Sequence, residues 1–249
     1  ARQIDGIADL SISTFGKTFI TTEKEEILSG PYQGTYEKGE KIPDPNCESN
    51  GGILLGGFCK FAYGKRFNVI NKERHHKAYL NLNTSVEDSF LISNDFNLIY
   101  AKVNVQDNPQ SPSYPALPFL SRNILPGEGS SPFENEIKWR GRPLGSNYPS
   151  PFSTKDIYQY HITDSMQFSF FENDFFDISI THSAHSNLAI RPDIINSRFQ
   201  EALAGKGGER KNLSWNLFAD INPDELVQYV SGNLIARKKG SLSSIDGIY

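Results

Sequence analysis

The residues best suited to chemistry are three histidines and one aspartate in the second half of the chain: His161, Asp164, His182 and His185. Histidine is the commonest metal ligand and the side chain that most readily exchanges a proton near neutral pH. His182 and His185, at the end of a strand, would supply two ligands of a metal site. The four residues predict a metal-assisted hydrolase as one candidate function; the alternative is that the histidines lie in a turn and hydrogen-bond carbonyl groups.

A second group of candidate catalytic residues is Glu134, Glu136 and Lys138. Glu-x-Lys on a strand matches half of a metal-dependent nuclease signature, in which the acid holds Mg²⁺ and the lysine orients water. That signature also needs an aspartate on a neighbouring strand, and Asp95 and Asp107 are distant in sequence. Glu-x-Glu also resembles the catalytic loop of mono-ADP-ribosyltransferases, but that family's Ser-Thr-Ser strand is not found upstream. Motifs of three residues arise often by chance, so a short solvated strand is the favoured interpretation.

The two cysteines, Cys47 and Cys59, enclose a glycine-rich stretch that could close as a hairpin. In an oxidising compartment the two sulfur atoms could then form a disulfide. Cys59 could instead act as a thiol nucleophile beside a distant histidine. Its apolar neighbours favour a buried or bonded cysteine over a catalytic one.

A possible ligand-binding group is Trp139 with Arg140 and Arg142. An aromatic ring beside guanidinium groups could stack a sugar or base and clamp a phosphate. A basic stretch over residues 60–77 could extend such a site. The alternative, which we favour, is that the ring anchors a loop and the arginines bind loop carbonyls.

The composition excludes several classes of protein. The chain has 249 residues, of which 37% are apolar and 22% are charged, as in globular proteins and unlike collagenous, coiled-coil or wholly disordered ones. The longest near-apolar run, residues 53–62, is too short for a membrane-spanning helix. A net charge of −4 argues against a dedicated nucleic-acid binder. The sequence indicates no particular cofactor, and for its location it slightly favours a soluble, virion-associated or extracellular protein.

Alternation of apolar and polar residues predicts β-strands over much of the chain. Residues 99–105 alternate with period two, which places one set of side chains on a buried face. Residues 166–170 and 176–180 alternate in the same way around Glu172-Asn173-Asp174, which predicts a hairpin. We expect residues 157–163 to form a third strand next to it.

Residues 106–156 form a proline-rich segment that holds nine of the fourteen prolines. Proline donates no backbone hydrogen bond, so a regular strand or helix should not run through this density. Large apolar side chains nevertheless recur in it, among them Phe133, Trp139 and Phe152. We therefore expect an irregular arm whose rings pack onto another part of the molecule or onto a neighbouring subunit.

The last quarter of the chain changes to a helical period. Ile195, Phe199 and Leu203 are spaced four residues apart, which predicts one helix. A second should begin at Asn222 and run to Gly240, so that residues 192–240 form a helical C-terminal part. The expected fold is a single α+β domain over residues 1–249, predominantly antiparallel β and sandwich-like, with two C-terminal helices and the irregular arm.

None of the candidate sites is complete in sequence, whereas β surface and aromatic loop content are abundant. The sequence therefore favours a non-enzymatic structural or interaction protein, a homo- or hetero-oligomeric subunit of a virion, tail or surface assembly. The metal-assisted hydrolase and a carbohydrate- or phosphate-binding module are the alternatives.

Overall fold

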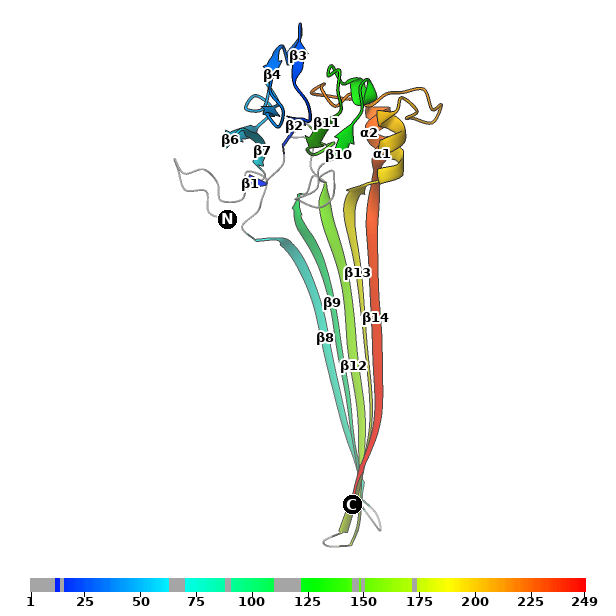
Figure 1. Ribbon diagram of the computed structural model, residues 1–249. Coiled ribbons are helices and arrows are strands. Elements are labelled where there is room, and N and C mark those ends of the chain that lie inside the picture. The colour runs from blue at the N-terminus through cyan, green and yellow to red at the C-terminus, as the bar shows by residue number, and fades with distance from the viewer. Residues whose placement is uncertain are drawn as a thin grey trace. The chain divides into compact units, whose positions relative to one another are not determined.

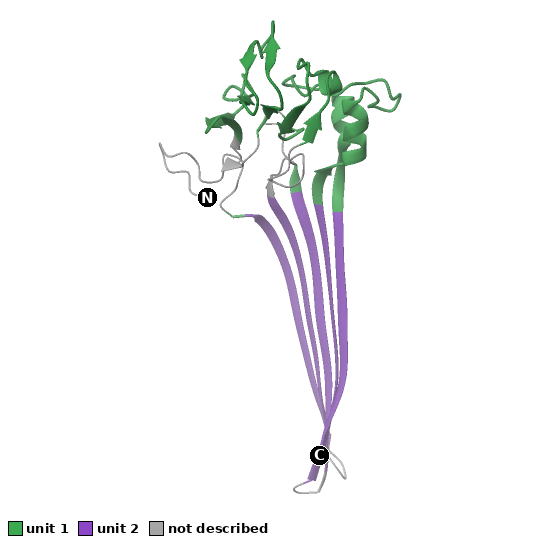
Figure 2. Ribbon diagram, in the orientation of Figure 1, with its two compact units in different colours: residues 1–70, 108–152, 191–234 green, residues 71–107, 153–190, 235–249 purple. Residues whose placement is uncertain are grey.

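The computed structural model describes residues 12–13, 16–62, 70–87, 91–109, 122–144, 148, 151–171 and 174–249. The fold is α+β and predominantly antiparallel β, as the sequence predicts, with helices near the C-terminus (Figure 1). Where the sequence suggests one domain, the contacts group the chain into two compact units, each built from three stretches (Figure 2). We call residues 1–70, 108–152 and 191–234 the core unit, and residues 71–107, 153–190 and 235–249 the sheet unit.

The core unit contains several small antiparallel sheets. One has the order β1 (Ile12–Ser13), β7 (Phe58–Ala62), β6 (Gly52–Leu55), and another the order β10 (Arg122–Ile124), β11 (Ile137–Arg140), β2 (Thr18–Thr21), β5 (Lys41–Pro43). A two-stranded sheet pairs β3 (Glu25–Ile27) with β4 (Gly34–Tyr36). The helical elements are the 3₁₀ turn η2 (Glu128–Ser130), α1 (Asn196–Leu203) and α2 (Asp224–Val230).

Aromatic side chains fill the centre of the core unit. Phe19 stacks on Phe218 with ring centroids 4.4 Å apart, and Phe199 contacts Trp139 and Trp215 at 5.9 Å and 5.4 Å. Phe19, Phe199 and both tryptophans are essentially inaccessible to solvent. Complete burial of a side chain of this size contributes about 1.5–3 kcal/mol each, so this cluster stabilises the unit as an ordinary hydrophobic core.

The described part of the proline-rich segment packs on its own chain, the first of the two arrangements expected, and not on a neighbouring subunit. Ile124, Phe133 and Trp139 are 0%, 2% and 1% exposed, inside the chain's own core. Two whole strands form here, β10 and β11, because the stretches between the prolines are long enough to pair with each other and with β2. The end of β9 (Leu91–Pro109) and the start of β12 (Phe152–Phe171) also lie in the segment. Residues 110–121, 145–147 and 149–150 of the segment lie outside the described part of the chain.

Both predicted C-terminal helices are present, and the prediction is wrong only in how far the second one extends. In α1, Phe199 and Leu203 face the core as their spacing predicts. The second helix ends at Val230, and the residues expected to continue it to Gly240 belong to strand β14 (Ser231–Ile248). Ser231 already has an extended backbone, with φ −75° and ψ 143°. Pairing of this segment with β13 (Asp174–Ile194) therefore overrides the local helical pattern.

The sheet unit is one antiparallel sheet of five unusually long strands in the order β14-β13-β12-β9-β8 (Figure 1). Its strands β12 (Phe152–Phe171) and β13 contain 20 and 21 residues, and β9 (Leu91–Pro109) and β8 (Lys72–Glu87) contain 19 and 16. Average strands contain about five or six residues. The predicted hairpin is confirmed, with Met166 opposite Ile178 and Phe168 opposite Phe176; its residues 172–173 lie outside the described ranges. Residues 157–163 are not a separate strand but an earlier part of β12.

Candidate functional site: an open five-stranded sheet

The two faces of the five-stranded sheet differ in chemistry. Because side chains alternate between faces, even-numbered residues of β8, β9, β12 and β13 share one face and odd-numbered ones share the other. A hydrogen bond between Asn94 and Asp164 shows that even-numbered residues of β9 and β12 share a face. The contact between His182 and Ser243 shows that odd-numbered residues of β14 are on this same face. The even face, which we call the apolar face, carries Leu80, Leu82, Phe96, Leu98, Tyr100, Tyr158, Tyr160, Ile162, Met166, Phe168, Phe176, Ile178, Ile180, Leu188 and, from β14, Ile245.

No apolar side chain of the sheet unit is buried within the described residues, where Ser153 is the one fully buried residue. Leu82 and Ile180 on the apolar face are 51% and 52% exposed, and Ile245 is 72% exposed. An antiparallel sheet usually has one face in water and the other packed on a core. Here the face that should be packed is open.

The opposite face, which we call the polar face, also carries exposed apolar side chains such as Ile99 and Phe175, but it satisfies much of its hydrogen bonding internally. The Tyr79 hydroxyl donates to Asn97 Oδ1 at 2.9 Å, and Asn81 Nδ2 donates to Asn97 and Asp95 at 2.8 Å and 2.9 Å. On β12, Thr163 contacts His161 at 2.9 Å. These ladders of polar side chains give the polar face a stable structure without a partner.

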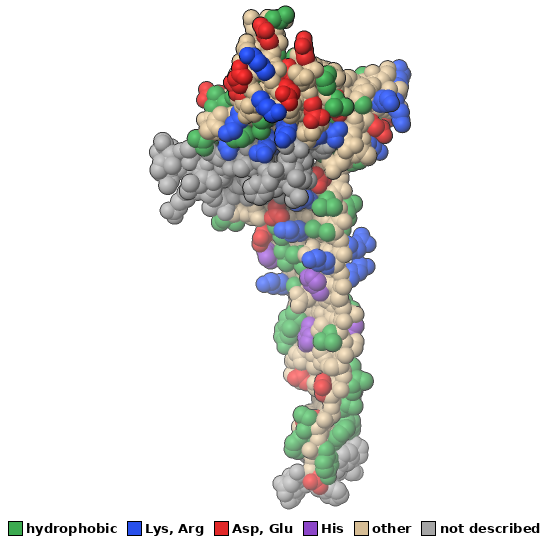
Figure 3. Space-filling model, in the orientation of Figure 1, with side chains coloured by type: hydrophobic (Ala, Val, Ile, Leu, Met, Phe, Trp, Pro, Cys, Tyr) green, Lys and Arg blue, Asp and Glu red, His purple; other side chains and the backbone are tan. Residues whose placement is uncertain are grey.

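Charge is separated along the strands. All eight Lys and Arg residues of the sheet unit lie toward one end, and we call this group the basic band: Lys72, Arg74, Lys77, Lys102, Lys155, Arg237, Lys238 and Lys239. The five described aspartates toward the other end form the acidic band: Asp95, Asp164, Asp174, Asp177 and Asp246. Figure 3 shows lysine, arginine and histidine side chains gathered over one half of the sheet.

Three acids lie among the basic residues, and each has a local partner. Glu73 contacts His75 at 2.9 Å, Asp107 pairs with Lys155 at 2.7 Å, and Asp156 contacts Asn104. With eight basic and three acidic residues, this half carries a net charge of +5 when its histidines are neutral. The acidic band carries −5. Basic residues near position 72 are evident in the sequence, but only the pairing of the strands shows that those of β14 lie at the same end of the sheet.

The histidines proposed as a catalytic or metal site are not brought together. His161 pairs with Ser183 and His182 with Ile162, so the two rings lie on opposite faces of the sheet. His185, three residues after His182, is on the same face as His161, and Asp164, on the face of His182, accepts a hydrogen bond from Asn94 at 2.7 Å. Within the described ranges no three His, Cys, Asp or Glu side chains are arranged to hold a metal ion.

The group around Glu134 lies in the core unit. Lys138 is in β11, opposite Asn123 and Ile20, whereas Glu134 and Glu136 precede that strand. The nearest buried acid is Glu25, whose carboxylate accepts hydrogen bonds from the backbone N–H groups of Glu134 and Asn135 at 3.2 Å and 2.9 Å. Sequence reasoning did not single out Glu25, and its contacts indicate that it holds this turn against β3.

The proposed ligand-binding group is largely internal. Trp139 is 1% exposed and packs against Phe199, so its ring cannot stack on a ligand from solvent. The guanidinium of Arg140 lies 6.0 Å from the ring centroid of Phe58. These contacts agree with the interpretation that the segment is anchored by its own aromatic side chain. The basic stretch 60–77 is divided, with Lys60 in β7 and Lys72, Arg74 and Lys77 in β8.

The cysteines are joined. Cys47 and Cys59 form a disulfide with their Cα atoms 5.7 Å apart, so Cys59 is not a free nucleophile. It closes the β6–β7 hairpin onto the preceding turn, as the glycine-rich spacing suggested. A Cβ atom on Gly52 would lie 2.7 Å from Cys47 Sγ, which explains why a glycine is needed beside the bridge.

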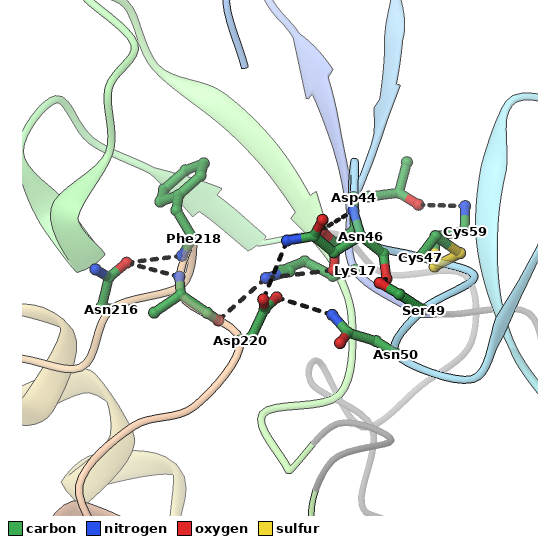
Figure 4. Close-up of polar contacts among 12 residues, drawn as sticks. Lys17, Asp44, Asn46, Cys47, Ser49, Asn50, Cys59, Asn216, Phe218 and Asp220 are labelled. Atoms are coloured by element: carbon green, nitrogen blue, oxygen red, sulfur yellow. Dashed lines mark hydrogen bonds and ion pairs between the residues drawn. A yellow bond between two sulfur atoms is a disulfide. The ribbon is translucent and has the colours of Figure 1, made fainter. Parts of the chain in front are cut away.

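A polar cluster in the core unit surrounds the disulfide (Figure 4). Lys17 Nζ lies 3.4 Å from Asp44 and donates to the carbonyl of Ala219 at 3.1 Å. The Asp220 carboxylate accepts from Asn46 and Asn50 at 3.0 Å and 2.8 Å. The cluster thus ties the segment 44–50 to the segment 216–220.

The cavity beside this cluster has a volume of about 70 Å³. Sites for small molecules are typically about 300–1,000 Å³, so this cavity has room for solvent and not for a sugar or nucleotide. The cluster is best explained as a structural clasp.

Comparison with known proteins adds no further assignment. No family model matches the sequence, and no curated protein or solved structure is similar to it. Across the described residues, the structure contains no helix with the length and hydropathy needed to cross a membrane.

Proposed function

We propose that this protein is a non-enzymatic subunit of a multi-subunit assembly and that it associates through the apolar face of its five-stranded sheet. The observation that carries the proposal is the exposure of that face: its large aliphatic and aromatic side chains are partly exposed, and those at Leu82, Ile180 and Ile245 are exposed by half or more. Soluble monomers rarely leave contiguous apolar patches larger than a few hundred Å² in water.

The apolar face is large enough for a stable interface. With a rise of about 3.3 Å per residue and about 4.8 Å between strands, five strands paired over roughly 15 residues give a face of about 50 by 20 Å, or about 1,000 Å². A standard protein interface buries about 800 Å² on each partner. Packing of two sheets face to face, about 10 Å apart, is a common way to cover such a surface.

The chemistry of the other candidate sites also favours an interaction protein. His182 lies on the opposite face of the sheet from His161 and His185, the tryptophan proposed to bind ligand is buried, and Cys59 is in a disulfide. Among the described residues, the open sheet is the candidate feature whose exposure needs an explanation outside its own unit.

The proposal is tested by the mass of the purified full chain in solution over a range of concentrations, measured by light scattering after size exclusion. We expect association, and we expect Leu82→Thr combined with Ile180→Thr to weaken it by at least about tenfold, which corresponds to about 1.4 kcal/mol. Threonine keeps the β preference of the replaced residues while it removes apolar surface.

The matched control is Ile99→Thr combined with Leu242→Thr. These residues are also exposed, at 47% and 70%, but lie on the polar face. Their replacement should leave the association unchanged. A chain that stays monomeric at all concentrations, or an equal loss in both double variants, would contradict the proposal.

A further inference from the structure

We infer that the partner covering the apolar face is a second copy of this chain, packed face to face with its strands reversed, so that the basic band of each copy lies over the acidic band of the other. The inference rests on the proposed function and adds to it the identity of the partner and its orientation. It follows from the separation of charge along the strands.

The charge distribution is self-complementary in one orientation and self-repelling in the other. The basic half carries +5 and the acidic band −5, and no lysine or arginine of the sheet unit lies at the acidic end. If two copies pack with their strands reversed about a twofold axis across the middle of the sheet, opposite charges meet twice. If they pack with the same ends together, basic residues meet basic ones, and like charges juxtaposed across an interface can cost several kcal/mol.

Several of the charges lie on the apolar face itself. Lys102 shares that face with Tyr158, and its Nζ is 5.2 Å from the ring centroid. Arg74 is on the apolar face because it is an even-numbered residue of β8. Arg237 and Lys239 are on it because, in β14, odd-numbered residues such as Ser243 share the face of His182. An aligned dimer would therefore bring these cations into the interface from both copies. In the acidic half the described charges on this face are Asp164, near the middle of β12, and Asp174. The other three aspartates of the acidic band are on the polar face.

The edges of the sheet are less suited to association than its face. The outer strands are β8 and β14, and both are exposed along most of their length. Each carries a cluster of cations at the same end, Lys72–Lys77 on β8 and Arg237–Lys239 on β14. Charged side chains, lysine above all, are a common means of preventing edge-to-edge pairing. Side-by-side extension of the sheet with the same ends together would place these two clusters against each other.

The proposed geometry makes a specific prediction for the central strand, β12. Ile162 is at its midpoint between Tyr158 and Met166, and all three side chains are on the apolar face. A twofold axis near Ile162 sets Tyr158 of one copy opposite Met166 of the other. Both residues are exposed, at 40% and 39%, so both are accessible to a crosslinker.

The test uses Tyr158→Cys and Met166→Cys as separate full-length variants, one of them carrying a mass tag. The two natural cysteines are bonded to each other, so each variant adds a single free thiol. A short bismaleimide should link the mixed pair at least about fivefold more efficiently than either variant alone.

Equal linking of each variant to itself, with no mixed product beyond the random share, would show aligned strands and overturn the inferred orientation. If only the Met166→Cys variant links to itself, the two copies overlap at their acidic ends alone, and the inferred orientation is overturned as well. In both cases the proposed function would stand. If no product forms and light scattering finds only monomer, the proposed function fails too.

Two further measurements separate the remaining explanations. Raising NaCl from about 0.05 M to about 0.5 M screens charge, so it should weaken the reversed dimer and would strengthen an aligned one. The second measurement is binding of the full chain to phosphatidylcholine vesicles. If the chain is monomeric, binds the vesicles, and loses that binding in the Leu82→Thr and Ile180→Thr variant, the partner is a lipid surface and the inference is contradicted.

Discussion

The core unit buries its large apolar side chains, whereas the sheet unit leaves its own exposed to solvent. In the core unit, segments distant in sequence enclose Phe19, Trp139, Phe199 and Trp215 until each is inaccessible to solvent. In the sheet unit, strands of 16 to 21 residues pair with one another along their length, yet their apolar side chains remain open. Backbone pairing can therefore build an extended sheet without a hydrophobic core, and such a sheet leaves its apolar face for a partner.

The largest expected effect comes from replacing a phenylalanine in each of the two units and comparing the loss of stability. Phe199→Ala should destabilise the core unit by about 3–5 kcal/mol, because it leaves a cavity beside both tryptophans. Phe175→Ala, on the polar face at 45% exposure, should change stability by less than about 1 kcal/mol. Urea unfolding followed by tryptophan fluorescence measures the first directly, since both tryptophans are in the core unit. Similar losses in the two variants would show that the sheet is packed after all.

Removal of the disulfide should also affect the core unit selectively. Cys47→Ala combined with Cys59→Ala opens a link with a sequence separation of 12 residues. The expected cost is about 2–4 kcal/mol, mainly because the unfolded chain becomes less constrained. The measurement is urea unfolding of the variant beside the oxidised parent. A loss of far-ultraviolet β signal from the sheet at the same urea concentration would mean that the two units unfold together.

Glu25→Gln tests how much a buried carboxylate contributes to the stability of the core unit. The Glu25 carboxylate is 2% exposed and accepts two backbone N–H groups, so the weaker acceptor should cost about 1–3 kcal/mol. The adjacent Glu26→Gln is the control, because Glu26 is exposed. The difference between their unfolding free energies should exceed the error of urea titration, and equal values would argue against a structural role for Glu25.

The smallest expected effect is an alkaline loss of stability in the core unit. Burial raises the pKa of Tyr32, with further increases from Asp44 and Asp220, and burial also raises the pKa of Tyr148. An unfolded tyrosine loses its proton near pH 10. The folded state keeps these protons at higher pH, so its stability is fully present below about pH 10 and falls as the pH rises further.

Tyr32→Phe should reduce that alkaline loss, measured as the urea midpoint between about pH 9 and 11. Tyr79→Phe is the control, because Tyr79 is 66% exposed in the sheet unit. A steeper loss in Tyr32→Phe than in the parent would contradict the assignment.

The candidate site was predictable from sequence only in part. The alternation in residues 166–180 correctly predicted the hairpin that joins β12 and β13 at the acidic end of the sheet. The same alternation could not show that no other layer covers it, because burial depends on contacts between distant segments. Likewise, the spacing of His182 and His185 suggested a shared site, whereas a strand places residues three apart on opposite faces.

By itself the sequence determined the features that depend on neighbours along the chain. These are the period-two strands, the inward face of α1 and the short spacing between Cys47 and Cys59. Tertiary structure decided the rest. It turned residues 231–248 into a strand through pairing with β13, buried Trp139 of the proline-rich segment, and gathered basic residues from four separate strands at one end of a sheet. The physical reason is that hydrogen bonding between strands and the exclusion of water act on whichever segments the fold brings together, regardless of their separation in sequence.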